Sequence, residues 1–192
     1  MLLAVDARAH GDSEGTKIGM GWPERVDIIK WINLILSWEP NARIVLHGVS
    51  MGAATVLMAS GEDLPGNVKA VIADCGYTSE WDEFQREADA LHIPWFPVLN
   101  ATSVLSKIRD GYDFKQASAL AQVKKSRIPT LFIHGSSDEL VPYSMLGELY
   151  AAAACEKEEL TVEGAGHALS SSVAPTLYWR TVEDFIAKYL DR

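Results

Sequence analysis

The sequence predicts an α/β fold, in which a mostly parallel β-sheet carries helices on both faces. Three observations lead to this prediction. Apolar runs of strand length alternate with longer segments of helical periodicity along the 192 residues. Such alternation requires crossover connections, and these place helices against both faces of a parallel sheet. The third observation is the motif Gly48-Val49-Ser50-Met51-Gly52, which joins an expected strand directly to an expected helix.

The first half of the chain supplies two expected strands and two helices. Residues 2–5 form a continuous apolar run, which is typical of a strand buried on both faces. Pro23 suits the first turn of a helix, and apolar residues at helical spacing extend that helix to residue 37. Residues 44–47 are the next strand, and a helix follows them to about residue 60.

The second half repeats the same alternation of strand and helix. Its expected elements, in chain order, are a strand at 68–73, a strand at 129–134, a helix that ends near 155, a strand at 160–162 and a helix at 176–190.

Residues 80–125 differ in character from the rest of the chain. They combine helical pieces with several aromatic side chains and with the interruptions Pro94 and Pro97. We interpret the chain as one domain over residues 1–192, with 80–125 inserted as a helical cap above the carboxyl edge of the sheet. The alternative is an ordinary helical connection whose aromatic residues are plain core.

The motif around Ser50 is typical of a nucleophile elbow. A serine on a tight turn between strand and helix has strained backbone, so its neighbours two residues away must lack bulk, and Gly48 and Gly52 meet that demand. The helix that follows points unpaired N–H groups at the place where negative charge develops during acyl transfer. A glycine-rich turn with an incidental serine is the alternative.

Two further strand exits carry the partners that a reactive serine needs. A serine hydroxyl is a weak nucleophile near neutral pH and requires a base within hydrogen-bond reach. His167 lies in a loop of small residues after the last strand, and Asp138 follows the strand at 129–134. Asp138 would hold the imidazole in the correct tautomer and stabilise the imidazolium.

Other residues compete for these roles. For the acid, the competitors are Asp74, which also lies at a strand exit, and Glu139. For the base, the competitors are His10, His47, His92 and His134. We expect His47 and His134 to have packing roles, with the His47 ring hydrogen-bonded locally. We expect His10 to order its loop through Asp6 or Asp12.

Composition narrows the classes of partner. The formal net charge of −9 and the pI near 5.0 argue against nucleic acid or an anionic membrane as the main partner. Cys75 and Cys155 have no metal-binding or redox spacing, so we expect no metal and no organic cofactor. The sequence shows neither a leader pattern nor an apolar run of the roughly 18 residues that span a bilayer. A cytoplasmic location is therefore expected.

Four segments carry a family resemblance, namely residues 4–15, 47–53, 134–142 and 164–168. They resemble the α/β-hydrolase superfamily, and most of all its bacterial esterase-like members of the serine aminopeptidase-like group. The resemblance implies that Ser50 is the nucleophile, Asp138 the acid and His167 the base, with the backbone N–H of Met51 as one oxyanion donor. It also implies hydrolysis of an ester, thioester or amide.

The sequence departs from this superfamily at one point. Three strands normally precede the strand that resembles residues 2–5, and the third of them carries the second oxyanion donor and lies between the strands matched by 2–5 and 44–47. The sequence supplies none of the three, so the fold it predicts is an N-terminally truncated α/β-hydrolase fold. Either the strands at 2–5 and 44–47 pair directly, or a gap or another chain separates them. Both arrangements leave an apolar sheet edge unpaired, which predicts a homo-oligomer.

The functional prediction is a serine hydrolase, specifically a carboxylesterase that acts on small or medium acyl esters through an acyl-enzyme on Ser50. An amide-cleaving peptidase is a variant within the same class. A catalytically silent module of the same fold, which binds a ligand or a partner, is the alternative from another class.

Overall fold

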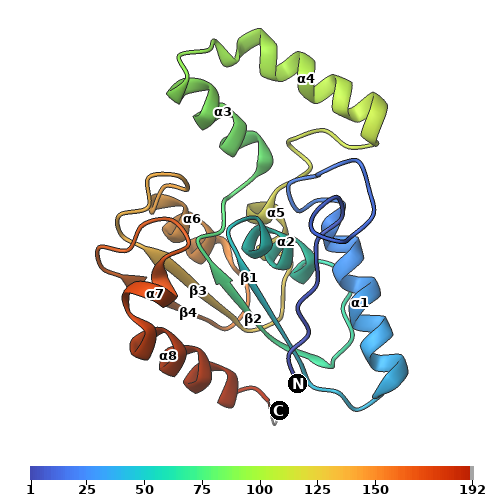
Figure 1. The fold of residues 1–192 in the computed structure, drawn as a ribbon, viewed down its shortest axis with the longest axis vertical. Helices are drawn as coiled ribbons and strands as arrows, with labels where there is room; N and C mark the ends of the chain where they lie inside the picture. The colour runs from blue at the N-terminus through green and yellow to red at the C-terminus, as the bar shows by residue number, and fades with distance from the viewer. Residues whose placement is uncertain (191–192) are drawn as a thin grey trace.

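The computed structural model describes residues 1–190 and confirms the predicted fold class. Four strands form one sheet in the order β1-β2-β3-β4, and each neighbouring pair is parallel. The strands are β1 (Ile44–Val49), β2 (Val68–Asp74), β3 (Thr130–Gly135) and β4 (Lys157–Val162). Figure 1 shows them side by side at the centre of the body of the molecule.

Helices cover both faces of this sheet (Figure 1). One face is covered by α1 (Glu24–Trp38), α2 (Met51–Ser60), α5 (Ala119–Val123) and α6 (Ser144–Ala152). The opposite face is covered by α7 (Ser170–Val173) and α8 (Pro175–Ala187).

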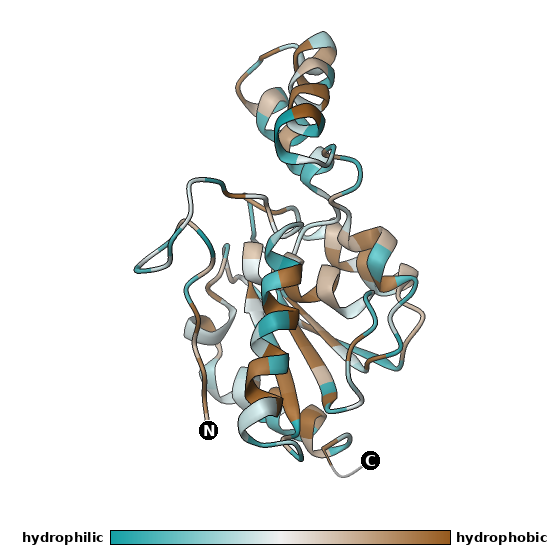
Figure 2. Cartoon of the chain, turned by 90° about the vertical axis from the view of Figure 1, so that its right-hand side faces the viewer, coloured by the Kyte–Doolittle hydropathy of each residue, from teal (hydrophilic) through white to brown (hydrophobic). Residues whose placement is uncertain are grey.

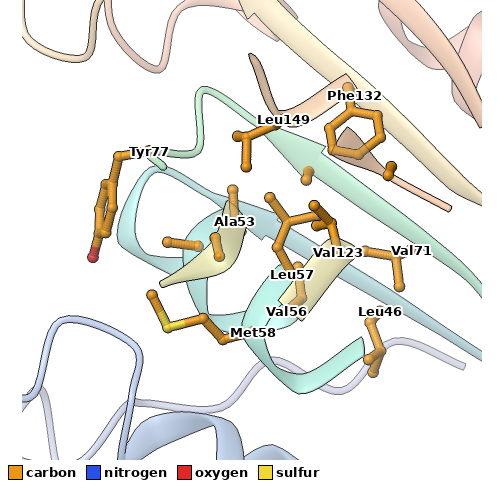
Figure 3. Close-up of a cluster of buried hydrophobic side chains, with 14 of the residues drawn as sticks. Leu46, Ala53, Val56, Leu57, Met58, Val71, Tyr77, Val123, Phe132 and Leu149 are labelled. Atoms are coloured by element: carbon orange, nitrogen blue, oxygen red, sulfur yellow. The ribbon is translucent and has the colours of Figure 1, made fainter. Parts of the chain in front are cut away.

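The two faces of the sheet form two separate cores. Along β2, Ala70 and Ile72 pack toward α8, whereas Val71 packs toward α2, because successive side chains of a strand point to opposite faces. Figure 3 shows Val71 in the same cluster of buried side chains as Leu57 of α2. The sheet is therefore fixed from both sides, and so are the loops at its carboxyl edge.

The prediction of a strand at residues 2–5 is wrong. Residues 1–7 run as an irregular segment outside the sheet, and the Leu2 side chain is 92% exposed. A strand needs a neighbour to complete its hydrogen bonds, and across residues 1–190 β1 pairs with β2 alone. Of the two arrangements that the sequence leaves open, the structure has the gap.

The strand at 160–162 begins three residues earlier than predicted. β4 starts at Lys157 and pairs with β3 over its whole length, although its first residues are polar. β4 lies at the edge of the sheet, so these residues are only partly buried and need no apolar pattern. A continuous apolar run identifies a central strand such as β3 more readily than an edge strand.

Between β2 and α5 lie α3 (Glu80–Ala90) and α4 (Trp95–Asp110), which stand at one end of the molecule (Figure 1). The Ser79 side chain caps α3 by accepting a hydrogen bond from the Asp82 N–H at 3.0 Å. The rings of Phe84 and Phe114 pack 4.9 Å apart between their centroids. The assignment of residues 80–125 as a cap over a substrate site stays a prediction.

None of the helices within residues 1–190 combines the length and the hydropathy that crossing a bilayer requires.

Candidate active site

Ser50 occupies a strained turn between β1 and α2. Its φ and ψ are 55° and −119°, a backbone conformation that residues other than glycine rarely adopt. The Ser50 N–H donates a hydrogen bond of 2.8 Å to the Asp74 carbonyl, which ties the turn to β2. A Cβ on Gly48 would lie 2.2 Å from the Gly52 carbonyl oxygen, so this position requires glycine.

The expectation that Gly52 must also lack bulk is wrong. Within residues 1–190, a Cβ built on Gly52 meets no atom within 4 Å apart from its chain neighbours and the backbone of its own helix. The reason is a cavity of about 820 Å³ beside β1, which Gly52 and Met51 help to line. The irregular N-terminal segment and α1 form its other walls, so the cavity occupies the gap where residues 2–5 fail to reach the sheet.

The structure brings Ser50, His167 and Asp138 into one hydrogen-bonded chain. Nε2 of His167 lies 2.8 Å from the Ser50 Oγ, and Nδ1 of His167 lies 2.9 Å from Oδ2 of Asp138. A carboxylate can only accept a hydrogen bond, so Nδ1 carries the hydrogen and Nε2 is free to accept from the serine hydroxyl. Each residue comes from a different strand exit, after β1, β3 and β4.

Asp138 is held firmly by its own loop. Its side chain is fully buried, and its Oδ1 accepts hydrogen bonds from the N–H groups of Leu140 and Val141 at 3.0 and 2.9 Å. These contacts leave Oδ2 facing the His167 ring. A buried carboxylate with several donors keeps a fixed orientation, and this fixes the ring that it contacts.

His134 also contacts this carboxylate, which sequence reasoning missed. We expected a packing role, but its Nε2 lies 3.2 Å from Oδ2 of Asp138 and 3.0 Å from the carbonyl oxygen of Val141. Both of these atoms are acceptors, so Nε2 is the donor. A signal existed in the sequence, because His134 precedes Asp138 by four residues across the exit of β3.

The alternative acid Asp74 lies in a different network. Its Oδ1 accepts a 3.0 Å hydrogen bond from the Ser170 hydroxyl, and it also interacts with Tyr178. Burial raises the pKa of Asp74 above its ordinary value. His47 belongs to the same network, because its Nε2 lies 2.9 Å from the Tyr178 hydroxyl, so its partner is distant in sequence rather than local. Burial lowers the pKa of His47.

The remaining competitors lie elsewhere. Nδ1 of His10 is 2.9 Å from the Arg8 carbonyl oxygen, so its ring orders the N-terminal loop through that carbonyl and not through Asp6 or Asp12. His92 follows α3, at the end of the molecule away from the sheet. Glu139 is exposed beside Asp138.

Cys75 lies directly beside the hydrogen-bonded chain. It is buried, and burial raises the pKa of its thiol to about 12, so the thiol stays neutral. Within residues 1–190, Cys75, Asp138 and His167 are the only group of three side chains placed closely enough to ligate one metal ion. Asp138 and His167 are hydrogen-bonded to each other, however, and a neutral thiol is a poor ligand. The geometry suits proton transfer better than metal binding.

Met51 is the first residue of α2 and immediately follows Ser50. The first N–H groups of a helix have no acceptor within the helix, and the helix dipole adds partial positive charge at this end. The predicted oxyanion donor is therefore placed where an anion formed next to Ser50 would need it. Met51 and Gly52 also help to line the cavity beside β1.

Comparison with known protein families and sequences gives a consistent result. A model of the prolyl oligopeptidase family matches residues 24–192. The chain is 30% identical over 187 residues to the uncharacterized protein YqkD of Bacillus subtilis, an alignment of 96% of this chain and 61% of that protein. It is 29% identical over 201 residues to the α/β hydrolase domain-containing protein WAV2 of Arabidopsis thaliana, an alignment of 98% of this chain and 61% of that protein. The chain thus spans about three fifths of these relatives.

Solved structures share the fold. The Pyrococcus furiosus esterase Pf2001 superposes with a TM-score of 0.72 at 21% identity, over 96% of this chain and 69% of that one. The acylaminoacyl peptidase of Pyrococcus horikoshii superposes with a TM-score of 0.65 at 18% identity, over 89% of this chain and 28% of that one. At these identities the likeness concerns the fold alone.

Proposed function

The chain belongs to the prolyl oligopeptidase family, within the α/β-hydrolase superfamily, and from this premise we propose that it is a serine hydrolase with Ser50 as nucleophile. One observation carries the proposal, namely the unbroken hydrogen-bonded chain from the Ser50 hydroxyl through His167 to Asp138. Its distances of 2.8 and 2.9 Å allow proton transfer without rearrangement of these side chains.

In the first half of the reaction, the Ser50 Oγ attacks the acyl carbon of the substrate while its proton passes to Nε2 of His167. The resulting imidazolium is stabilised by the Asp138 carboxylate. When the tetrahedral intermediate collapses, the bond to the leaving group breaks and His167 returns the proton to that group. The acyl group remains on Ser50 as an ester.

In the second half, water takes the place of the leaving group. His167 removes a proton from the water as its oxygen attacks the acyl carbon. The collapse of this intermediate returns the proton to the Ser50 Oγ and releases a carboxylic acid. In both halves the N–H of Met51 faces the developing oxyanion, and the loss of one such donor typically lowers turnover by about 100- to 1,000-fold.

For the substrate we propose small or medium acyl esters. The esterase fold of the Pyrococcus furiosus neighbour and the apolar side chains in residues 80–125 favour this class. We infer that residues 80–125 form a cap beside the acyl site. We further propose a cytoplasmic protein that acts on small molecules rather than on nucleic acid, in keeping with its net charge of −9.

A fluorophosphonate probe tests the proposed nucleophile, because it reacts covalently with an activated serine. We expect the wild-type protein to be labelled, Ser50→Ala to be unlabelled, and Ser137→Ala to be labelled as the wild type is. Ser137 is a suitable control because it is an exposed serine of the same loop as Asp138. Failure to label a folded wild-type sample would instead support the catalytically silent module.

An amide-cleaving peptidase is the second candidate. The family description and the acylaminoacyl peptidase fold favour it. The ratio of kcat/KM for a p-nitrophenyl ester to that for an N-acyl p-nitroanilide with the same acyl group decides between the two activities. A ratio above the intrinsic reactivity difference of the two compounds supports the esterase, and a ratio below it supports the peptidase.

We also propose that copies of the chain associate through the outer edge of β1. Within residues 1–190 this edge has no strand partner, and unpaired edges are templates for pairing with another chain.

A further inference from the structure

The cavity beside β1 is elongated and has helices for two of its walls. Its volume of about 820 Å³ lies within the range of about 300–1,000 Å³ that is typical of sites for small organic ligands. On α1 its lining extends from Glu24 to Leu34, about 15 Å along the helix axis, and on α2 from Met51 to Val56. Of the β1 residues only His47 takes part. Figure 2 shows the N-terminal segment, which forms a further wall, running beside α1.

Both helices contribute apolar side chains to this cavity. The apolar lining residues of α1 are Ile28, Trp31 and Leu34, and those of α2 are Met51 and Val56. Ile28 and Met51 also pack against the buried cluster on this face of the sheet, so the core holds them in place. A hydrocarbon chain in the cavity would contact apolar surface from two sides and lose its contact with water.

The charged side chains that lie on α1, or that pair with it, are engaged within the chain. Nε of Arg8 donates a hydrogen bond of 2.6 Å to Asp27, and Nζ of Lys30 lies 3.5 Å from the same carboxylate. Glu24 accepts two backbone N–H groups at 2.8 and 2.9 Å. A charged acyl group would find no free counter-charge on this wall, and its removal from water would cost free energy that a hydrocarbon chain does not lose.

The remaining charged residues of the lining lie in the N-terminal segment. They are Asp6, Glu14 and Lys17, and all three are exposed. Lys17 forms an ion pair with Asp110 of α4, and its Nζ donates a 3.2 Å hydrogen bond to the Arg109 carbonyl oxygen. One wall of the cavity is therefore attached to the inferred cap.

The position of His167 determines the side of Ser50 on which an acyl chain can extend. His167 reaches Ser50 from the exit of β4, whereas the cavity lies beside β1, at the other edge of the sheet. In the proposed reaction the leaving group lies near Nε2 of His167, because the imidazole returns the proton to it. The oxyanion faces the N–H of Met51. The acyl chain is the remaining substituent of the acyl carbon, and it extends away from His167, toward the cavity.

We propose that the cavity beside β1 binds the acyl chain of the substrate, and that this chain is neutral, aliphatic and of medium length. The inference rests on the proposed function and adds a residue that controls access to the cavity. Gly52 follows Ser50 by two residues and lines the cavity. Within residues 1–190, a Cβ at this position meets nothing within 4 Å apart from its chain neighbours and its own helix backbone. A larger side chain there occupies the path of the acyl chain, so Gly52 determines specificity.

The ratio of kcat/KM for p-nitrophenyl octanoate to that for p-nitrophenyl acetate tests this proposal. Gly52→Leu should lower the ratio by at least about tenfold, because the leucine obstructs the octanoyl chain more than the acetyl group. Gly147→Leu is the matched control and should leave the ratio unchanged. In the described chain, a Cβ on Gly147 likewise has no contact within 4 Å beyond its neighbours and its own helix backbone, but α6 packs against α5 and β3.

Trp31→Ala tests the same cavity from α1. It removes a half-buried ring from the lining, so kcat/KM for the dodecanoate ester should rise severalfold relative to the octanoate ester. Circular dichroism shows whether each variant retains its helices. Hydrolysis with chain-length ratios that Gly52→Leu and Trp31→Ala both leave unchanged overturns the proposal, while the serine hydrolase stands.

Binding of octanamide to Ser50→Ala, measured by calorimetry, tests the cavity without any turnover. We expect binding, and binding weaker by at least about tenfold when Gly52→Leu is added. Absence of binding to folded Ser50→Ala, or binding that Gly52→Leu leaves unchanged, overturns the proposal. If octanamide binds in a manner that depends on Gly52, but the wild type neither hydrolyses esters nor reacts with the fluorophosphonate, then the proposed function fails and the cavity remains a binding site.

Discussion

At the scale of single residues, the two glycines of the serine motif make different demands. A Cβ on Gly48 would lie 2.2 Å from the Gly52 carbonyl oxygen. Among the described residues, a Cβ on Gly52 meets nothing within 4 Å apart from its chain neighbours and the backbone of its own helix. Gly48 is therefore required for steric reasons, whereas Gly52 borders an open cavity.

We predict opposite effects for alanine at these two positions. Gly48→Ala should lower the free energy of unfolding by about 3 kcal/mol or more, because backbone atoms must move to admit the methyl group. Gly52→Ala, in the first turn of α2, should change it by no more than about 1 kcal/mol and in the stabilising direction. Urea unfolding of the two variants measures both values. Equal destabilisation by both would contradict the prediction.

Asp138 offers a second prediction at this scale. Asp138→Asn keeps the size of the side chain, and its carbonyl oxygen can still accept the N–H groups of Leu140 and Val141. The amide then donates toward Nδ1 of His167, which forces the hydrogen onto Nε2 and removes the acceptor for Ser50. Turnover of an activated ester should fall by about 10⁴-fold with little change in KM. A loss of turnover smaller than tenfold would contradict the proposed role of Asp138.

These residues also indicate what a sequence can predict. The meeting of Ser50, Asp138 and His167 was predictable because each lies in a loop that leaves a strand, and the carboxyl ends of parallel strands share one edge. The contact between His134 and Asp138 was not predictable from residue type. The buried His134 ring could equally have had a packing role alone. The way in which the loop after β3 folds back decides that it contacts Asp138 and Val141.

At the scale of secondary structure elements, the first turn of α3 contains a buried carboxyl group. Glu80 is 2% exposed, and its Oε2 has no hydrogen-bond partner among the described residues. Burial and then the nearby charge of Glu24 raise the pKa of Glu80 to about 8, against an opposing hydrogen bond from Tyr112. Glu80 therefore binds a proton in the folded protein at neutral pH.

Its contribution to stability has a definite sign. In the unfolded chain this carboxyl group titrates near 4.3, so between about pH 4.3 and pH 8 the folded state holds one proton more than the unfolded state. The contribution of Glu80 to the free energy of unfolding is therefore complete below this pH window. It decreases as pH rises through the window, by a few kcal/mol at most.

Glu80→Gln should remove this dependence, because the amide stays neutral at every pH. We predict that the free energy of unfolding of the wild type, measured relative to the variant, decreases from pH 5 to about pH 8. Glu87→Gln is the control, since Glu87 lies on the same helix with its side chain 44% exposed. Parallel curves for the wild type and Glu80→Gln would contradict the assigned cause.

The elements that the sequence predicted least well are those whose structure depends on a neighbour. Residues 2–5 have the composition of a buried strand, but within residues 1–190 they find no strand to pair with. β4 is polar at its start and becomes a strand because β3 lies beside it. Helix α2 and strand β3, which are apolar on all sides, were predictable to within a residue or two because burial alone determines their pattern.

At the scale of the whole molecule, the proposed association of copies concerns the outer edge of β1, which has no strand partner within residues 1–190. If copies pair through this edge, the backbone N–H groups of β1 gain partners, and their hydrogen exchange slows. We predict slower exchange in residues 44–49 at high protein concentration than at low concentration, measured by mass spectrometry. Exchange that is independent of concentration in this segment, in a sample that still dimerises, would contradict pairing through β1.

The placement of the three hydrogen-bonded side chains has one more consequence. Ser50, Asp138 and His167 all stand on loops that leave β1, β3 and β4, and none of them comes from α3 or α4. We therefore predict that warming melts α3 and α4 before the sheet, and that the proposed hydrolysis at the strand ends survives this first step. Heat inactivation should then follow the collapse of the sheet, and the earlier loss of the proposed cap should change only which substrates the protein accepts.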